Sequence, residues 1–251
     1  MNLIILTDAD RIGDNSFRIS DLRAEHIRTV LKSSVGDTVS VGLLNGPCCT
    51  AQIVLVESDM VELKADNWKE LSPPRPEIDL VCALPRPQTL KKVLLTCAMM
   101  GVRSLHLIRA NRVEKSYFQS PLIQPENQLP YLIEGLAQGK LTRLPQVQVH
   151  DRFRRFFEDE LREINSEGPT ESLRLLCSPD TEATLDQVYP RGVDRLMIAI
   201  GPEGGWVPFE VELMQSAGFC PFTLGRWNLR VEHAVTAALA QVELKRTMSG
   251  F

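Results

Sequence analysis

An apolar run that ends directly in a glycine-rich loop constrains this chain most. Residues 196–200 read Leu-Met-Ile-Ala-Ile, and residues 201–206 read Gly-Pro-Glu-Gly-Gly-Trp. An apolar run of this length that stops at a Gly/Pro cluster is typical of a buried strand followed by a tight loop. The glycines at 201, 204 and 205 allow positive φ angles, and they allow a ligand to approach the backbone without meeting a Cβ atom.

The same pattern recurs further along the chain. Residues 222–230 read Phe-Thr-Leu-Gly-Arg-Trp-Asn-Leu-Arg, which predicts a second short strand that ends in a glycine-containing loop. Residues 231–245 are apolar and rich in alanine, a pattern that predicts a helix. Ligands of open α/β sheets bind at the carboxyl ends of the strands. The two loops therefore predict one small-molecule site at that edge of a parallel sheet.

The segments IGPEGGW at 200–206 and LGRWNLRVEHA at 224–234 together resemble the two C-terminal signatures of the RsmE family. These SPOUT-superfamily enzymes transfer a methyl group from S-adenosylmethionine to N3 of a uridine in 16S ribosomal RNA. The resemblance extends more weakly to the N-terminus and so covers most of the chain. It implies S-adenosylmethionine as cofactor, ribosomal RNA of the small subunit as partner, and a homodimer formed through the C-terminal domain.

A proline-rich stretch at residues 72–76 predicts the domain boundary, because three prolines in four residues continue neither a helix nor a central strand. We expect one domain at 1–72 and a second at 73–251. The first shows strand patterns at 38–44, 50–57 and 60–65, a helix pattern at 20–32, and a hairpin signal at Asn45-Gly46. These features predict a small barrel, and the resemblance identifies it as a PUA-like RNA-binding domain.

The second domain alternates strand and helix patterns and predicts an α/β fold with a largely parallel sheet. The predicted strands are 78–84, 104–108, 147–150, 173–177, 195–200 and 221–224, and the predicted helices are 88–100, 129–139, 151–165, 209–217 and 231–247. The pattern alone indicates an unknotted sheet, since knots are nearly absent from proteins. The family resemblance instead implies a deep trefoil knot in a SPOUT domain.

Net charge, cysteine content and the lack of a long apolar run each argue against one class of protein. The net charge of −4 means that a local basic patch, rather than the field of the whole protein, must attract any polyanion. There is no Cys-x-x-Cys among the six cysteines and there are four histidines, so we predict no zinc site. The N-terminus lacks a basic segment and no apolar run approaches membrane-spanning length. We therefore expect a cytoplasmic protein.

The resemblance places the cofactor against three strand-end loops, where backbone amides and carbonyls recognise adenine and ribose. A phosphate-binding loop is disfavoured because no Gly-Lys-Ser/Thr follows the glycines, and simple tight turns are the alternative. The predicted cofactor-binding residues are Leu176, Cys177, Ser178, Ile200, Gly201, Pro202, Glu203, Gly204, Gly205, Leu224, Gly225, Trp227, Asn228 and Leu229.

Arg230 and Glu232 are the predicted catalytic residues, because they match the Leu-Arg-x-Glu motif of the family. Uridine N3 is a weak nucleophile while it is protonated, so a base must remove the proton or a cation must stabilise the charge that spreads onto O2 and O4. Arg230 is predicted to supply that cation, with a purely structural role as the alternative. Glu232 is predicted either to orient Arg230 or to hold the helix end. His233 is a weaker candidate for the base.

Arginines at two places are predicted to contact RNA. A basic face on the first helix region would contact phosphate, with a solvated helix surface as the alternative. The family's arginine-containing segments correspond to residues 111–115 and 137–145. The predicted RNA-binding residues are Arg18, Arg23, Arg28, Arg112 and Arg143.

Five positions depart from the family pattern. Thr96, Met99 and Ala137 stand where the family commonly has lysine or an acid, and Val231 and His233 stand where it commonly has threonine. The cofactor loops match better than the segments that face the substrate. Two alternatives therefore stay open: a methyltransferase for another RNA position, and a catalytically weak RNA-binding or ribosome-assembly factor.

Overall fold

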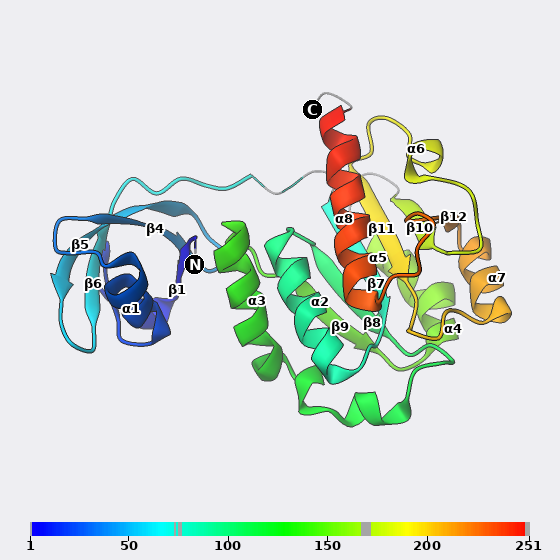
Figure 1. Ribbon diagram of the computed structural model, residues 1–251, viewed down its shortest axis with the longest axis horizontal. Helices are drawn as coiled ribbons and strands as arrows, with labels where there is room; N and C mark the ends of the chain where they lie inside the picture. Colours follow the sequence, from blue (N-terminus) through cyan, green and yellow to red (C-terminus); the bar gives the residue numbers. More distant parts are fainter. Residues whose placement is uncertain (1, 73, 75–76, 167–171, 249–251) are drawn as a thin grey trace.

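The computed structural model describes residues 2–72, 74, 77–166 and 172–248. Figure 1 shows a smaller N-terminal domain beside a larger C-terminal domain. Of the predicted linker, residues 73, 75 and 76 lie outside the described residues. No helix in the described ranges is long and apolar enough to cross a membrane.

The N-terminal domain is built on a six-stranded sheet with the order β1-β4-β5-β6-β3-β2. β1 and β4 pair in parallel and the other neighbours pair antiparallel. The predicted hairpin at Asn45-Gly46 is confirmed, since it joins β4 to β5. The bounds are β1 (Ile4–Leu6), η1 (Asp8–Asp10), β2 (Arg11–Gly13), β3 (Ser16–Ile19), α1 (Leu22–His26), η2 (Ile27–Leu31), β4 (Thr38–Leu43), β5 (Cys48–Val56) and β6 (Val61–Ala65).

The helix predicted at 20–32 is shorter as an α-helix than its pattern indicated. Asp21 caps α1 by accepting a hydrogen bond from the backbone N–H of Arg23 at 2.9 Å. The chain then widens into the π turn η2 and stops at Lys32, whose φ of 53° is left-handed. Ala24 and Ile27 are buried in the hydrophobic core of the N-terminal domain, which also includes Phe17.

The C-terminal domain is built on a second six-stranded sheet, with the order β12-β10-β11-β7-β8-β9. Every pair of neighbours in it is parallel, which confirms the predicted α/β class. β11 is buried along its whole length, as its apolar run predicted. The strands are β7 (Glu77–Ala83), β8 (Ser104–Ile108), β9 (Gln146–His150), β10 (Leu173–Cys177), β11 (Arg195–Ile200) and β12 (Cys220–Phe222).

Helices cover both faces of this sheet. The helices α2, α3 and α8 pack on one face (Figure 1), while η5, α5 and α7 pack on the other. The helix predicted at 151–165 is interrupted by a π turn. The bounds are α2 (Pro87–Met99), η3 (Lys115–Gln119), η4 (Pro121–Ile123), α3 (Pro125–Gly139), α4 (Phe153–Arg155), η5 (Phe156–Glu160), α5 (Leu161–Ser166), α6 (Leu185–Val188), α7 (Pro208–Ser216) and α8 (Val231–Met248).

The two domains are joined by direct contacts as well as by the chain. The backbone N–H groups of Asn2 and Leu3 both donate to the carbonyl of Ala137 on α3. The hairpin turn of the first domain docks on the second, since Asn45 Oδ1 accepts from the Leu144 N–H at 2.9 Å. Thr142 Oγ1 donates to the Gly46 carbonyl at 2.6 Å. The residues before β1 and the β4–β5 turn therefore both connect the two domains.

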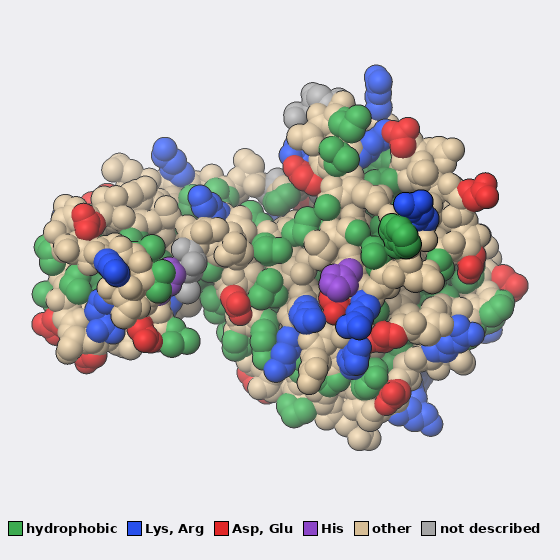
Figure 2. Space-filling model, in the orientation of Figure 1, with side chains coloured by type: hydrophobic (Ala, Val, Ile, Leu, Met, Phe, Trp, Pro, Cys, Tyr) green, Lys and Arg blue, Asp and Glu red, His purple; other side chains and the backbone are tan. Residues whose placement is uncertain are grey.

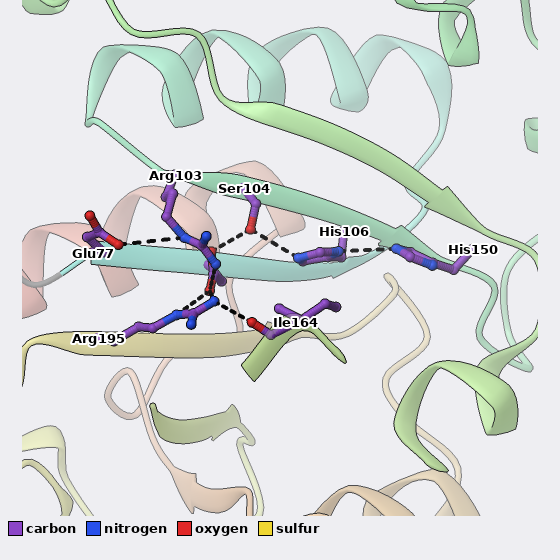
Figure 3. A network of polar contacts seen from close by, with 8 residues as sticks. Glu77, Arg103, Ser104, His106, His150, Ile164 and Arg195 are labelled. Carbon is purple, nitrogen blue, oxygen red and sulfur yellow. Dashed lines mark hydrogen bonds and ion pairs between the residues drawn. The ribbon is translucent and has the colours of Figure 1, made fainter. Parts of the chain in front are cut away.

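A buried carboxylate crosslinks the amino half of the C-terminal sheet. Asp79 on β7 is fully buried and accepts hydrogen bonds from the Arg103 guanidinium at 2.8 and 2.6 Å. Arg195 on β11 donates to the same carboxylate at 3.2 Å, and the Ser104 hydroxyl donates to it as well. Figure 3 shows the polar contacts continuing from Ser104 to His106 and His150.

His106 extends this network along β8 and is almost completely buried. Its Nε2 lies 3.0 Å from Ser104 Oγ and its Nδ1 lies 3.1 Å from His150 Nε2. Because the Ser104 hydroxyl donates to Asp79, we assign the Nε2 proton of His106 to the bond with Ser104. Burial, together with nearby His150, lowers the pKa of His106 to about 4. The imidazole is therefore neutral in the folded protein at pH 7.

Acid is expected to destabilise the fold through His106. Its folded pKa of about 4 lies below the reference value of 6.5, so protons bind the unfolded chain more tightly. This contribution to stability is complete above about pH 6.5. It is lost as the pH falls toward 4, by a total on the order of 3 kcal/mol. Urea unfolding between pH 4.5 and 7.5 measures it.

The variant His106→Gln isolates this effect, because glutamine does not titrate. Its free energy of unfolding should depend less on pH in this window than that of the wild type. The exposed His233 is the matched control, and His233→Gln should retain the wild-type slope. Equal slopes for His106→Gln and the wild type would assign the acid sensitivity to other groups.

Candidate functional site

A cavity of about 420 Å³ lies at the carboxyl ends of β10, β11 and β12. The loop after each of these strands contributes to its wall, and α8 closes one side with Val231 and Ala234. The predicted edge of the sheet therefore holds a cavity. The predicted residues in its wall are Cys177, Ser178, Ile200, Gly201, Pro202, Glu203, Gly204, Gly205, Leu224, Gly225, Trp227, Asn228 and Leu229.

Leu176 alone among the predicted cofactor-binding residues does not line the cavity. Its side chain is completely buried on the face of the sheet that α7 covers, against a core that includes Met197 and Met214. Side chains alternate between the two faces of a strand, so the residue before Cys177 points into the core. Any contact of Leu176 with a ligand would have to come from its backbone.

The glycine-rich loop after β11 is a tight turn with close neighbours. The Gly205 N–H donates to the Pro202 carbonyl at 2.8 Å, and Gly205 has a φ of 74°. A Cβ on Gly201 would lie 3.0 Å from Trp206 Nε1, and a Cβ on Gly204 would lie 3.1 Å from Arg112 Cδ. Gly204 lines the cavity, and its missing side chain also leaves room for Arg112.

Arg112 and Trp206 also belong to the cavity wall. Arg112 was predicted to bind RNA, yet its guanidinium donates to the Gly204 carbonyl and so holds the glycine-rich loop. Trp206 follows the glycines of the motif and also lines the cavity. Its Nε1 is buried and has no hydrogen-bond partner among the described residues, so the wall contains an unsatisfied donor.

Gly225 is the most permissive point of the third loop. Its φ is 123°, a backbone conformation that residues with a side chain rarely adopt, and nothing lies within 4 Å of a Cβ built there. A hydrogen bond from α8 holds the start of the loop, because Gln241 Nε2 donates to the Leu224 carbonyl at 3.1 Å. The open space at Gly225 therefore belongs to the cavity and not to a packing contact.

The cavity wall also includes residues that were not among the predicted cofactor-binding residues. Val231 and Ala234 are three residues apart on α8, a spacing that places both on one face of a helix and could have indicated their role. Asp180 and Thr223 lie next to predicted segments, and no pattern distinguished them. The additional residues in the wall are Arg112, Pro179, Asp180, Trp206, Val211, Thr223, Val231 and Ala234.

The two predicted catalytic residues differ in exposure and contacts. Arg230 is exposed directly before α8, between the lining residues Leu229 and Val231. Glu232 is buried, and its Oε1 accepts a hydrogen bond from Lys92 Nζ at 3.2 Å. This contact links α8 to α2. Burial raises the pKa of Glu232, but hydrogen bonds from its own backbone N–H and from Lys92 outweigh burial and hold that pKa below its usual value.

Glu232 therefore has contacts that fit the second of its two predicted roles. Within the described ranges its carboxylate is bonded to Lys92 and not to Arg230, and it does not line the cavity. An acid in the first turn of α8 also interacts favourably with the helix dipole. These contacts hold the start of the helix and leave Arg230 unassisted.

The arginines predicted to form an RNA-binding face on the first domain are engaged within it. Arg23 is 17% exposed and donates to both Asp10 and Asp21. Arg18 pairs with Glu62 at 2.7 Å, and Arg28 donates to the Ser58 carbonyl. Arg23 in particular has little surface left to offer a phosphate, because its partners surround it.

Arg143 lies instead at the junction of the domains. It is exposed and lines a cavity of about 550 Å³, together with Asn45, Glu70 and Arg103. This position leaves the prediction that it contacts RNA unchanged.

Three of the five departures from the family pattern lie in helix packing. Thr96 is buried on α2, and a Cβ on Gly139 of α3 would lie 2.2 Å from the Met99 carbonyl. The Ala137 carbonyl accepts hydrogen bonds from the backbone N–H groups of Asn2 and Leu3. None of these three lines the cavity, whereas Val231 does and His233 is exposed.

Comparison with known proteins shows what the chain is similar to. The profile of the RNA methyltransferase domain matches residues 72–243. Ribosomal RNA small subunit methyltransferase E of Treponema pallidum is 31% identical over 243 residues, which cover 96% of this chain and 90% of that protein. The Borreliella burgdorferi protein named ribosomal RNA small subunit methyltransferase E 1 is 25% identical over 238 residues, 95% of each chain.

Solved structures share the whole fold. A probable rRNA methyltransferase from Porphyromonas gingivalis has a TM-score of 0.76 at 22% identity, and the match covers 99% of both chains. Ribosomal RNA small subunit methyltransferase E from Neisseria gonorrhoeae, solved with S-adenosyl methionine bound, has a TM-score of 0.74 at 19% identity over 98% of both chains.

Proposed function

Since the chain belongs to the ribosomal RNA small subunit methyltransferase E family, we propose that it transfers a methyl group from S-adenosylmethionine to small-subunit ribosomal RNA. The observation that carries this proposal is the cavity where the three strand-end loops meet. We further propose that the acceptor is N3 of a uridine.

The residues of the cavity fit the cofactor chemically. S-adenosylmethionine supplies an activated methyl group on a sulfonium. The protein therefore has to bind the cofactor, align the methyl group with the attacking nitrogen, and accommodate the release of one proton. Glu203 and Asp180 offer carboxylates to its cationic groups, and Arg112 offers a guanidinium to its carboxylate. The unpartnered Nε1 of Trp206 is a donor for a ligand oxygen or nitrogen. Glycine backbone supplies the remaining polar groups.

Arg230 is the residue we propose to act on the uracil ring. Its guanidinium is exposed beside the cavity wall, and in the described part of the chain it forms no ion pair that would occupy it. A permanently charged, planar donor there would stabilise the negative charge on O2 or O4 as the N3 proton leaves. Arg230 would thereby make N3 a better nucleophile without acting as a base.

The surface around this site suits a polyanion although the whole chain is acidic. Figure 2 shows Lys and Arg side chains gathered over α2 and the start of α8. Exposed residues of these segments include Lys91, Lys92 and Arg230. Such a local patch steers RNA toward the cavity despite a net charge of −4.

Three structural features complete the proposal. Residues 1–72 would form a PUA-like RNA-binding barrel, and residues 73–251 a SPOUT domain whose C-terminal segment passes through a trefoil knot. The protein would be a homodimer. Leu244 and Met248 of α8 are 60% and 75% exposed, an apolar surface that a second copy would cover.

Gly225→Ala is expected to weaken cofactor binding about 10-fold. A side chain at a φ of 123° adds backbone strain of about 1 to 3 kcal/mol, and the loop would relax away from the geometry that faces the cofactor. A loss of 1.4 kcal/mol is tenfold in affinity. Titration calorimetry with S-adenosylmethionine measures it and also tests the proposed function, because wild-type protein that binds no cofactor would refute it.

Gly36→Ala is the matched control. Gly36 also has a positive φ, 97°, and nothing within 4 Å of its Cβ position, but it lies in a turn of the first domain. Both variants should lose comparable stability, and only Gly225→Ala should lose cofactor affinity. If the two variants bind S-adenosylmethionine equally well, the third loop is not part of the cofactor site.

A further inference from the structure

A second cavity, of about 380 Å³, lies on the far side of the loop that carries Arg112. It is lined by the segment after β8, by α4 and by the start of α7. Arg112 faces the first cavity, whereas its neighbours Asn111 and Val113 line the second. In the same way Trp206 lines the first cavity and Val207 lines the second. The two cavities therefore share one wall, and we call the second one the flanking groove.

Three cations border the flanking groove. Arg109, Lys115 and Arg154 come from the segment after β8 and from α4. Neither Arg109 nor Lys115 has an ion pair in the part of the chain that the structure describes, and Arg154 has only a surface contact with Glu158 at 3.7 Å. Two cations are thus available to an anionic ligand.

Two of these cations lie against aromatic rings, of which Phe209 lines the groove and Phe118 does not. The Arg154 guanidinium lies over the Phe209 ring at 5.0 Å from its centroid, and Phe209 is 47% exposed. The Arg109 guanidinium lies 5.7 Å from the centroid of Phe118. Exposed aromatic rings and guanidinium planes are the surfaces on which unpaired RNA bases stack.

The one carboxylate in the groove is fully engaged. Glu210 is buried, and its two oxygens accept hydrogen bonds from the backbone N–H groups of Asn111 at 2.6 Å and Val207 at 3.0 Å. It therefore ties the segment after β8 to the start of α7 and fixes the floor of the groove. The surface presented to a ligand remains cationic and aromatic.

We infer that the flanking groove binds one nucleotide of the substrate RNA next to the nucleotide that is methylated. Its phosphate contacts Arg109 and Lys115, and its base stacks on Phe209. The shared wall places this nucleotide beside the one that enters the cofactor cavity. The inference rests on the proposed function, which supplies RNA as the substrate, and adds a site where the RNA strand is held in register.

Methylation of a transcript of small-subunit ribosomal RNA tests the inference with Phe209→Ala and Arg109→Ala. Each should raise the KM for RNA about 10-fold, as expected for the loss of one stacked base or one phosphate contact. The turnover at saturating RNA and the affinity for S-adenosylmethionine should stay unchanged. Phe209→Trp should retain the wild-type KM, because the ring is kept. Arg109→Ala should also reduce the salt dependence of RNA binding.

Arg162→Ala controls for the loss of a positive charge, since Arg162 is exposed on α5 away from the groove. An equal KM increase for Arg162→Ala, or no increase for Phe209→Ala, would overturn the inference. So would weaker binding to intact small subunits with unchanged binding to naked RNA, which would mean that the groove contacts a protein. If the wild type transfers no methyl group to the transcript or to intact small subunits, the proposed function fails, and filter binding of the transcript still tests the groove.

Discussion

Arg230→Ala is expected to slow methyl transfer at saturating RNA about 100- to 1,000-fold, the usual effect of removing one donor that stabilises a developing oxyanion. The affinity for S-adenosylmethionine should remain near that of the wild type, because the side chain is exposed and does not line the cavity. The fold should also survive. The Arg230 backbone carbonyl accepts from the N–H groups of His233 and Ala234, and these bonds do not involve the side chain.

Two further variants distinguish catalysis from simple attraction of RNA. Arg230→Lys should restore little activity, because an ammonium lacks the planar fork of a guanidinium. Arg226→Ala removes another exposed charge from the same loop, where its guanidinium lies over the Trp227 ring. It should affect the KM for RNA more than turnover. If saturating RNA restores full turnover to Arg230→Ala, Arg230 only binds an RNA phosphate and is not catalytic.

Asp79→Ala is expected to lower the free energy of unfolding by about 3 to 5 kcal/mol, the cost of breaking a buried ion pair from one side. The substitution would leave Arg195, whose side chain is 5% exposed, and Arg103, which is 15% exposed, without the carboxylate between them. A loss of this size is a large share of a typical stability of about 5 to 15 kcal/mol. Urea unfolding with an unchanged m value would measure it.

Asp186→Ala is the matched control for Asp79→Ala. Asp186 is 80% exposed and pairs with Lys245 at the surface, so its loss should cost less than about 1 kcal/mol. Asp79 lies at the amino half of the sheet, away from the cavity, so activity per folded molecule should be unaffected by either variant. Similar losses in the two variants would mean that the buried network contributes little to stability.

The central strands of the parallel sheet could be predicted from the sequence alone. The bounds of β8, β10 and β11 agree with the prediction. β11 is marked by a continuous apolar run, whereas β8 and β10 are mostly apolar segments that include His106 and Arg174. The hairpin at Asn45-Gly46 could be predicted because local turn chemistry decides it. The glycine-rich loops could be placed at one edge because parallel strands share their direction.

Short strands and tertiary ion pairs could not be predicted in this way. β1 to β3 have three or four residues each, too few for a periodic pattern to stand out, and the α6 turn has four. The helix pattern around Arg23 indicated which residues share a face but not which partners reach them. Its main partner, Asp10, lies in a different element, and that contact removes Arg23 from the exposed basic face.

The site was predicted where it depends on backbone and missed where it depends on packing between distant segments. The glycines and the Leu-Arg-x-Glu segment carry local information. The bonds of Arg112 to Gly204 and of Glu232 to Lys92 join residues 92 and 140 positions apart, and no local pattern predicts them. The positions of Thr96 and Met99 show the same limit, since only the packing of α2 places them away from the cavity.

The central claim is that the cavity at the ends of β10, β11 and β12 delivers a methyl group to a uridine base of small-subunit ribosomal RNA. The most direct measurement incubates the protein with isotope-labelled S-adenosylmethionine and unmodified small subunits, then digests the RNA to nucleosides for mass spectrometry. We predict labelled 3-methyluridine as the modified nucleoside, and about 100- to 1,000-fold slower formation of it with Arg230→Ala. Label on a ribose oxygen or on another base, or no label with the wild-type protein, would contradict the account.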